Sequence, residues 1–292
     1  MRQSWLQLTI RAGKRDLEIL SNYAIEQGSP GVVLKTGSVN AFFLSSRRDA
    51  ALKSELQRFV SERARKVRLE WSIVKSEDWE HSWRRFIKPV RVGRSFWVTP
   101  PWLQAPKFHR RRIITIEPGM AFGTGTHATT RGCMEFLEIV AAKLAGKSWS
   151  VLDVGTGSGI LAIASRILGA TTIWAIDNDP VAVEVARENL HSNAMAGAVV
   201  LSGQNLGSIR RRFTVLVANL TAETILEIAD GLEKRVAAGG YMVLSGILRP
   251  QTGTVVHRFA KNFRVLERRG RREWVSVLFQ RSGSSAKRWP TY

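Results

Sequence analysis

A glycine-rich turn joins an apolar segment to a helix-forming segment in VLDVGTGSGILAIA at residues 151–164, and this combination leaves few possible folds for the chain. Three glycines, Gly155, Gly157 and Gly159, let the main chain pass close to a ligand, and the following helix offers its N-terminal amides. Asp153 precedes the first glycine, and Asp177 closes the next apolar segment 22 residues after it. The pattern predicts a strand, a turn and a helix, with an acid at the next strand end that can accept two hydrogen bonds from a ribose.

The spacing of these glycines distinguishes between two nucleotide-type ligands. Dinucleotide-binding turns follow G-x-G-x-x-G, whereas this turn follows G-x-G-x-G. It resembles the nucleoside-binding motif of class I methyltransferases, which use S-adenosylmethionine, a cofactor without phosphate. The resemblance implies that Asp153, Gly155, Gly157 and Asp177 bind this cofactor.

The order of predicted elements divides the chain into two domains. Residues 1–76 follow a strand–helix–strand–strand–helix–strand order, which predicts a small α+β, ferredoxin-like domain. Residues 113–281 alternate apolar strands with helices, which predicts an α/β, doubly wound, Rossmann-like sheet with its ligand at the carboxyl ends of the strands. Residues 282–292 are expected to form a basic, disordered tail.

Between the two domains, residues 77–112 form a predicted linker that is rich in tryptophan and arginine. Aromatic rings interleaved with arginines suit stacking on RNA bases, and they also suit packing at a hinge between domains. We expect the hinge role for Trp79, Trp83, Trp97 and Trp102.

Asn219 ends the apolar segment VLVAN, so we expect it at the carboxyl edge of the sheet, facing the methyl group to be transferred. There its amide can orient the cofactor or the substrate. Class I enzymes that methylate base amines or glutamine amides carry N/D-P-P-Y/F at this place, whereas this chain continues as NLTA. The difference counts against those two substrates.

A second glycine-rich stretch, AFGTGTHATT at residues 121–130, precedes a helix predicted from about residue 129. We expect this loop to fold over the ligand as a lid, with Phe122, Gly123 and Thr124 at the cofactor and the hydroxyl of Thr130 at the helix start. Both glycine turns would then serve one cofactor. His127, within the lid, is a candidate acceptor of the substrate proton, or a residue that shapes the loop.

The charge is unevenly distributed along the chain. The net charge is +20, and residues 205–292 hold 16 basic and six acidic residues. Segments such as HRRRI at residue 109 and RRGRREW near residue 270 suit RNA or an acidic partner. A single cysteine excludes an internal disulfide or a thiolate metal cluster, no metal is expected, and no segment reads as a signal peptide or membrane span. These observations predict a soluble, cytoplasmic protein.

The motifs PGMAFGTGTHATT, VLDVGTGSGILAIA, AIDNDPVAVEVARENL, VANL, LSGIL and REW, together with DWEHSW before them, stand in the order found in the ribosomal protein L-eleven methyltransferase family (PrmA type). The similarity covers roughly residues 77–279. It implies that the small domain recognises ribosomal protein L-eleven, free or in the ribosome. It also implies that the large domain methylates lysine side chains and an N-terminal α-amine, with Thr130, Gly155, Asp177 and Asn219 contacting the cofactor.

Three alternatives follow from the same residues. The basic segments suit an RNA methyltransferase or an enzyme that contacts ribosomal RNA. A lysine methyltransferase that acts on an acidic protein, such as an electron-transfer flavoprotein subunit, would also explain the charge. A non-catalytic binding module is the third, although the intact glycine turn and the acidic residue expected at the ribose argue against it.

Within the methyltransferase interpretation, Glu117 is a candidate for holding the incoming ammonium group of the substrate.

Overall fold

The computed structural model describes residues 4–29, 32–44, 49–63, 67–75, 88–104, 111–118 and 125–283. Their contacts divide them into two compact units. The smaller unit contains the described residues up to Lys88 together with Pro118, and the larger contains those of 89–117 and from Gly125 onward. Each unit is described by itself. No helix among the described residues is long and apolar enough to cross a membrane.

The smaller unit is a four-stranded antiparallel sheet with two helices. Its elements are β1 (Ser4–Arg11), α1 (Lys14–Glu26), β2 (Val32–Lys35), β3 (Ser38–Leu44), α2 (Asp49–Arg63) and β4 (Arg68–Lys75). The strands lie in the order β2-β3-β1-β4. Alternate residues of β1, Leu6, Leu8 and Ile10, pack against Leu20 and Leu56 of the helices. The ferredoxin-like order predicted for this part of the chain is confirmed.

The larger unit contains a seven-stranded sheet in the order β10-β9-β8-β11-β12-β14-β13. Its elements are α4 (Ala128–Lys143), β8 (Ser150–Val154), α5 (Ile160–Ile167), β9 (Thr172–Ile176), α6 (Pro180–Ser192), β10 (Val200–Ser202), η1 (Leu206–Ser208), β11 (Phe213–Asn219), α7 (Ala222–Glu227), α8 (Ala229–Arg235), β12 (Val236–Leu248), η2 (Arg249–Gln251), α9 (Thr252–Phe259), β13 (Phe263–Arg271) and β14 (Trp274–Arg281). Strands β8 to β12 pair in parallel, whereas β14 pairs antiparallel with both of its neighbours. The α/β methyltransferase sheet is thus confirmed.

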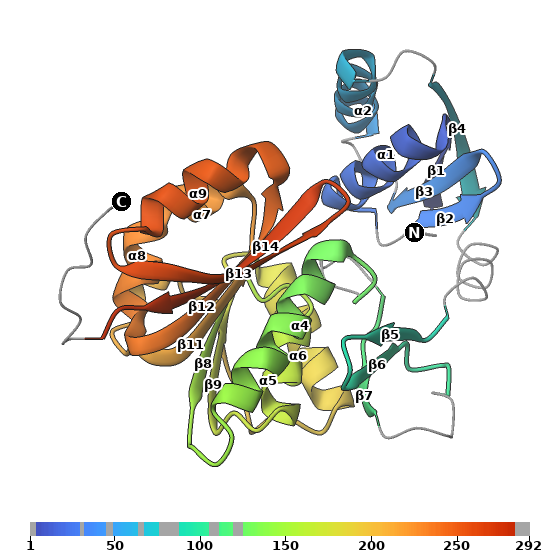
Figure 1. Cartoon of the computed structure of the whole chain (residues 1–292). Coiled ribbons are helices and arrows are strands. Elements are labelled where there is room, and N and C mark those ends of the chain that lie inside the picture. The colour runs from blue at the N-terminus through green and yellow to red at the C-terminus, as the bar shows by residue number, and fades with distance from the viewer. Residues whose placement is uncertain are drawn as a thin grey trace. The chain divides into compact units, whose positions relative to one another are not determined.

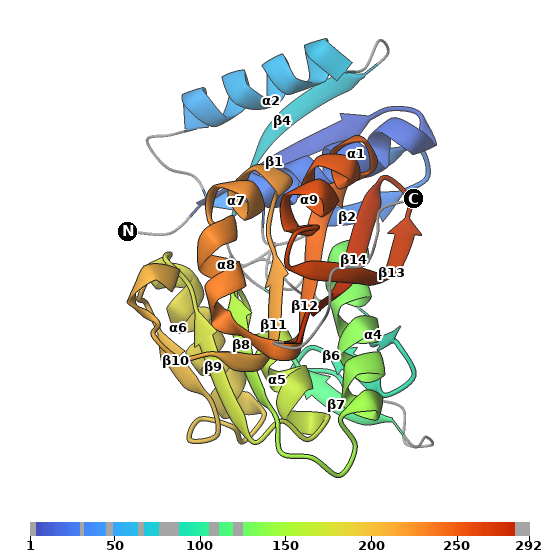
Figure 2. The same ribbon diagram turned by 60° about the vertical axis from the view of Figure 1, so that its left-hand side comes forward.

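Helices cover both faces of this sheet, with α4, α5 and α6 on one side and α7, α8 and α9 on the other (Figures 1 and 2). Each face has its own apolar core, and neighbouring residues of one strand contribute to opposite cores. Along β11, Val215 and Val217 belong to the first core, and Leu216 and Ala218 belong to the second. A strand covered on both faces must be apolar throughout, which explains the continuous apolar segments in the sequence.

A small second sheet in the larger unit differs from the expected linker. Its strands are β5 (Val90–Val92), β6 (Phe96–Thr99) and β7 (Arg112–Thr115). All four residues of β6 are buried, and Trp97 in this strand has the guanidinium of Arg91 over its ring. Trp97 is therefore not an exposed surface for stacking RNA bases, and it belongs to a sheet of the larger unit instead of a linker. In the sequence, the short apolar segment that forms β6 is difficult to recognise as a strand because tryptophans and arginines surround it. Trp79 and Trp83 lie outside the described residues, as does most of the predicted tail.

Candidate functional site

The glycine turn lies where the strand order of the large sheet reverses. Strand β8 is flanked by β9 on one side and by β11 on the other, so the chain proceeds outward in both directions from this pair. In open α/β sheets, ligands bind beyond the carboxyl ends of the strands at such a point. Gly155 follows β8, Asp177 follows β9 and Asn219 ends β11. The fold therefore brings these three predicted site residues to one edge of the sheet.

The backbone of the turn requires glycine. Gly155, Gly157 and Gly159 have φ values of 70°, 54° and 80°, in the left-handed region that side chains disfavour. A Cβ at Gly155 would also lie 2.5 Å from Cδ2 of Leu220, which follows β11. The turn thus packs closely against the next strand end, and helix α5 begins directly after Gly159.

Asp177 holds this turn through its carboxylate. Oδ2 accepts a hydrogen bond from the amide of Gly157 at 2.9 Å, and Oδ1 accepts one from the amide of Asp179 at 3.1 Å. A carboxylate oxygen can accept more than one hydrogen bond, so both oxygens keep capacity for ligand hydroxyls. The arrangement suits the predicted ribose contact because the acid is already oriented beside the turn.

Asp153 lies beneath the turn and is fully buried. Its Oδ2 accepts hydrogen bonds from the Thr156 hydroxyl at 2.7 Å and from the Ala162 amide at 3.2 Å. Burial is the main cause that raises the pKa of Asp153 to about 7, and the nearby Asp177 carboxylate adds to the rise. These contacts connect the turn to α5, so Asp153 has a structural role in positioning the turn. A contact with the cofactor would be a second role for the same carboxylate.

Thr130 at the start of α4 and Asn219 at the end of β11 contact each other. Nδ2 of Asn219 donates to the hydroxyl of Thr130 at 3.4 Å, and Thr130 is completely buried in α4. The contact joins residues 89 positions apart, which the sequence pattern placed separately at a helix start and a strand end. It supports the expectation that the two residues serve the same ligand.

Two buried acceptor atoms near the turn test whether this site fits the expected cofactor. Oδ1 of Asp153 and Oδ1 of Asn219 have no hydrogen-bond partner among the described residues. A buried acceptor without a partner is costly, so a hydrogen-bond donor from a ligand would be favourable at both atoms. S-adenosylmethionine carries an ammonium group, a cationic sulfonium, ribose hydroxyls and an adenine amine. The residues present therefore fit the cofactor.

Asn189 of α6 and Asn193, which caps the C-terminus of that helix, hold the segment around β7. Neither residue was predicted from the sequence to belong to the site. Oδ1 of Asn189 accepts from the amide of Glu117 at 2.9 Å, and its Nδ2 donates to the carbonyl of Ser158 at 2.9 Å. One helical turn later, Asn193 bonds both backbone groups of Thr115. The sequence pattern that could have indicated these contacts is the pair of asparagines four residues apart in ENLHSN. The pattern alone does not show that their side chains bond to distant backbone groups.

The loop predicted to be a lid is described from Gly125 onward, and this part is held at the start of α4. His127 caps α4, with Nδ1 2.7 Å from the Thr129 hydroxyl, and its ring lies edge-on to Trp274 at 5.4 Å. Burial lowers the pKa of His127 to about 4, so the imidazole is neutral and weakly basic at pH 7. These features favour a role in shaping the loop over a role as proton acceptor. Phe122, Gly123 and Thr124 lie outside the described residues.

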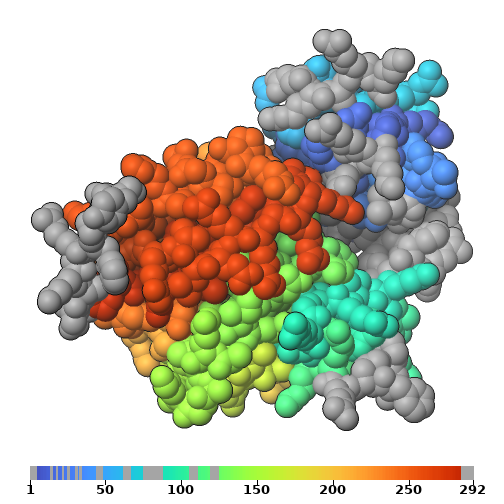
Figure 3. Space-filling model, in the orientation of Figure 1, coloured from blue at the N-terminus to red at the C-terminus, as the bar shows by residue number. Residues whose placement is uncertain are grey.

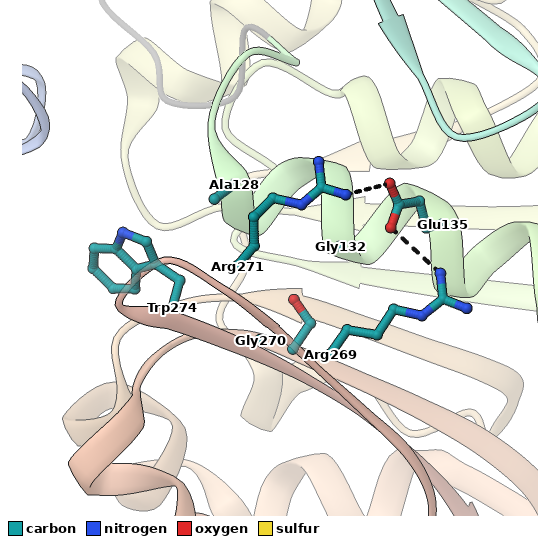
Figure 4. Close-up of a pocket in the computed structure, with 8 residues that line it drawn as sticks. Ala128, Gly132, Glu135, Arg269, Gly270, Arg271 and Trp274 are labelled. Atoms are coloured by element: carbon teal, nitrogen blue, oxygen red, sulfur yellow. Dashed lines mark hydrogen bonds and ion pairs between the residues drawn. The ribbon is translucent and has the colours of Figure 1, made fainter. Parts of the chain in front are cut away.

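A separate pocket of about 300 Å³ opens between α4 and the β13–β14 hairpin. Glu135 lies in it between two arginines, 2.9 Å from Arg271 and 3.4 Å from Arg269 (Figure 4). Trp274 also lines this pocket, whereas no residue predicted to bind the cofactor does so. The pocket is therefore distinct from the glycine turn, although both lie against α4.

Comparison with known proteins agrees with this geometry. The family model described as "Ribosomal protein L11 methyltransferase (PrmA)" matches residues 4–282. Proteins named ribosomal protein L11 methyltransferase are similar over nearly the whole chain. The one from Pelobacter propionicus is 36% identical, covering 97% of this chain and 99% of the relative, and the one from Geobacter sulfurreducens is 33% identical, covering 97% and 100%.

A solved structure is also similar. The crystal structure of ribosomal protein L11 methylase from Lactobacillus delbrueckii subsp. bulgaricus aligns with a TM-score of 0.60 and 29% sequence identity. The alignment covers 67% of this chain and 100% of that one. The similarity in fold thus accompanies the similarity in sequence.

Proposed function

Because the chain belongs to the ribosomal protein L11 methyltransferase (PrmA) family, and is therefore a protein methyltransferase that uses S-adenosylmethionine, we propose that it methylates ribosomal protein L11. The observation that carries the proposal is the convergence of Gly155, Asp177 and Asn219 at the reversal point of the sheet. This is the place where an α/β sheet binds its ligand.

The finer parts of the proposal concern the substrate groups and the place of reaction. The proposed acceptors are lysine side chains and the N-terminal α-amine of L11, either free or within the ribosome, and the reaction takes place in the cytoplasm. The chain lacks the P-P-Y/F that follows the asparagine in enzymes acting on planar amines, which supports an alkyl amine instead. The smaller unit is the proposed recognition domain.

S-adenosylmethionine supplies a methyl group on a cationic sulfonium, whose departure leaves a neutral thioether. The protein therefore mainly has to align a neutral amine with that methyl group. In our proposal, the turn at Gly155 and Gly157 and the carboxylate of Asp177 bind the cofactor, while Asn219 and Thr130 orient the reacting end. The buried Asp153 carboxylate offers Oδ1 to a cationic group.

The incoming lysine has an ordinary pKa of about 10.4 and must lose its proton before transfer. Burial lowers the pKa of an amine, and a neighbouring cation lowers it further, so the proton can leave to water. His127 is a poor acceptor at neutral pH because burial lowers its pKa to about 4. Glu117 remains a candidate for guiding the ammonium group, and its amide is held by Asn189.

The test uses radiolabelled S-adenosylmethionine and lysate from a strain that lacks this protein. We expect label in L11, at lysines located by mass spectrometry, and at least tenfold less label when the Asp177→Ala variant replaces the wild type at a cofactor concentration well below the wild-type dissociation constant. Label confined to RNA, or to an acidic protein such as an electron-transfer flavoprotein subunit, would retain the methyltransferase and replace the substrate. Absence of label in every fraction, despite measurable cofactor binding, would favour a binding module.

A further inference from the structure

Helix α4 approaches the sheet very closely at Gly132, in its second turn. A Cβ at Gly132 would lie 2.1 Å from Oγ of Ser276 and 2.9 Å from Cβ of the same serine, which belongs to β14. Carbon atoms in ordinary contact are about 3.5 to 4.0 Å apart, so no side chain fits here while the helix keeps its place. Figure 3 shows the β13–β14 hairpin, in red, against α4, in green, and both residues line the pocket of Figure 4.

Space, and not backbone conformation, requires the glycine at this position. Gly132 lies within the helix and does not have a positive φ, unlike the glycines of the cofactor turn. In a helix interior, glycine is less favourable than alanine by about 1 kcal/mol. The chain thus loses helix stability at Gly132, and what the glycine provides is the close approach of α4 to β14.

Beneath α4, polar side chains form a row across four strands of the sheet. Asn219 of β11 pairs in register with Ser245 of β12, and Ser276 of β14 pairs with Arg269 of β13. The hydroxyls of the two serines are 2.7 Å apart, and both serines are buried. Residues two positions away along β11, β12 and β14 belong to the core on the α4 side, so the row faces α4. The close approach at Gly132 and the amide of Asn219 therefore lie on one face of the sheet.

The first turn of α4 carries the residue that contacts Asn219. Thr130 lies two positions before Gly132, about 3 Å along the helix axis, and its hydroxyl accepts from Nδ2 of Asn219 at 3.4 Å. This distance is close to the limit for a hydrogen bond, so a displacement of a few tenths of an ångström breaks it. The depth at which α4 sits on the sheet therefore determines whether Thr130 holds the Asn219 amide.

A side chain at residue 132 would displace α4 more readily than the sheet. Strand β14 is paired along both of its edges, with β12 and with β13. Beside Ala128 and Gly132, in contrast, the pocket of about 300 Å³ leaves room for the start of α4 to move. The Ser276 hydroxyl can rotate away from an added methyl group, but its Cβ cannot. The helix must then move by about 0.6 to 1.1 Å to restore an ordinary contact, which is enough to break the bond between Thr130 and Asn219.

We propose that Gly132 and Ser276 are positioning residues for methyl transfer, because their contact sets the depth of α4 on the sheet and thereby holds the Asn219 amide at the reacting end of the cofactor. This inference rests on the proposed function for the role of Asn219. A misplacement of about 1 Å at a reacting group can cost about a hundredfold in rate. A contact outside the glycine turn thus has a measurable effect on turnover.

The test variant is Gly132→Ala in the full-length protein. We expect turnover with S-adenosylmethionine and L11 to fall by about tenfold to a hundredfold, while the dissociation constant of the cofactor changes by less than about threefold in calorimetry. A purely structural role would lower the melting temperature and leave the turnover of the folded enzyme unchanged. Turnover within about twofold of the wild-type value would overturn the inference.

A second substitution, in β14, makes the test specific. Ser276→Gly removes both atoms within 3 Å of the added Cβ, and the next atom, Oγ of Ser245, lies at an ordinary distance of 4.0 Å. Gly132→Ala/Ser276→Gly should therefore restore turnover to within about threefold of that of Ser276→Gly alone. Gly132→Ala/Ser276→Ala retains the Cβ of residue 276 at 2.9 Å, so it should restore turnover only in part. If Ser276→Gly gives no recovery in the Gly132→Ala background, the inference is wrong.

The matched control is the same substitution at a helical glycine with open space around it. Gly253 is exposed in α9, and a Cβ there would meet no described atom within 4 Å. Gly253→Ala should leave turnover and cofactor affinity within about twofold of the wild type and should stabilise the protein by up to about 1 kcal/mol. A loss of turnover as large as that of Gly132→Ala would assign the effect to helix propensity and overturn the inference.

A measurement without substrate separates this inference from the proposed function. The side-chain amide signals of Asn219, assigned in heteronuclear NMR spectra by comparison with Asn219→Ala, should shift in Gly132→Ala and return in Gly132→Ala/Ser276→Gly. If they do so while the wild type fails to methylate L11, the proposed function fails and the positioning contact is supported. If the wild type methylates L11 while Gly132→Ala changes neither the amide signals nor turnover, this inference fails and the proposed function is unaffected.

Discussion

Replacing Asp177 with alanine should weaken S-adenosylmethionine binding between tenfold and a hundredfold. The change removes the acceptor proposed for the ribose hydroxyls, and it also removes the carboxylate that orients the Gly157 amide at 2.9 Å. A hydrogen bond to a charged group contributes about 1.5 to 3 kcal/mol, and part of this is recovered when water replaces the lost acceptor. A net loss of about 1.4 to 2.8 kcal/mol corresponds to the stated range.

The neighbouring acid provides the control for this experiment. Asp179 is exposed and caps α6, where its Oδ1 accepts from the Val181 amide at 2.9 Å. Asp179→Ala removes a carboxylate of the same kind two residues away, so it should cost about 1 kcal/mol of stability with little effect on cofactor affinity.

Isothermal titration calorimetry with S-adenosylmethionine measures both variants against the wild type. A dissociation constant for Asp177→Ala within twofold of the wild-type value would refute the assignment of Asp177 to the ribose. Equal weakening in both variants would refute it as well, because the effect would then follow from the net charge and not from the position of the carboxylate.

Three other predictions concern the same edge of the sheet. Asn219→Ala should lower turnover more than cofactor affinity, as measured by steady-state kinetics and calorimetry, and the opposite pattern would argue against its place beside the methyl group. Asn189→Ala leaves the Glu117 amide and the Ser158 carbonyl without their side-chain partner, which costs about 1 to 3 kcal/mol for each group. The melting temperature should therefore fall by several degrees, and an unchanged melting temperature would contradict the bridge. Asp153 has a raised pKa of about 7, so the folded chain without cofactor binds more protons than the unfolded chain from about pH 4 to 7 and loses stability as the pH rises. Asp153→Asn should remove this loss, so the melting temperature of the variant relative to the wild type should rise between about pH 4 and 7. If the difference between the two melting temperatures stays constant over that pH range, Asp153 does not titrate in it.

Local patterns in the sequence were sufficient for the fold class and for placing Asp177 and Asn219 at strand ends on one edge of the sheet. The G-x-G-x-G turn needs residues with positive φ, and the structure has all three glycines in that region. The acid after β9 and the asparagine at the end of β11 were predictable because parallel strands end at a common edge. In these cases neighbouring residues determine the geometry.

The small sheet and the contacts of Asn189 and Asn193 could not be predicted in this way. Strand β6 is short, and its pairing with β7 joins segments separated by the tryptophan-rich and arginine-rich residues that resembled a linker. Asn189 bridges residues 72 and 31 positions away, and its spacing in the helix alone does not distinguish a bridge from a solvated side chain.

Local conformations could be predicted from the amino-acid sequence: the glycine turns, the apolar strands and the order of the elements. The packed structure was needed to show which polar groups contact one another, such as Thr130 and Asn219, and which buried acceptors, such as Oδ1 of Asp153, have no partner among the described residues. The physical reason is that backbone preferences act between near neighbours. Burial and hydrogen bonding between distant residues depend on how complete strands and helices pack.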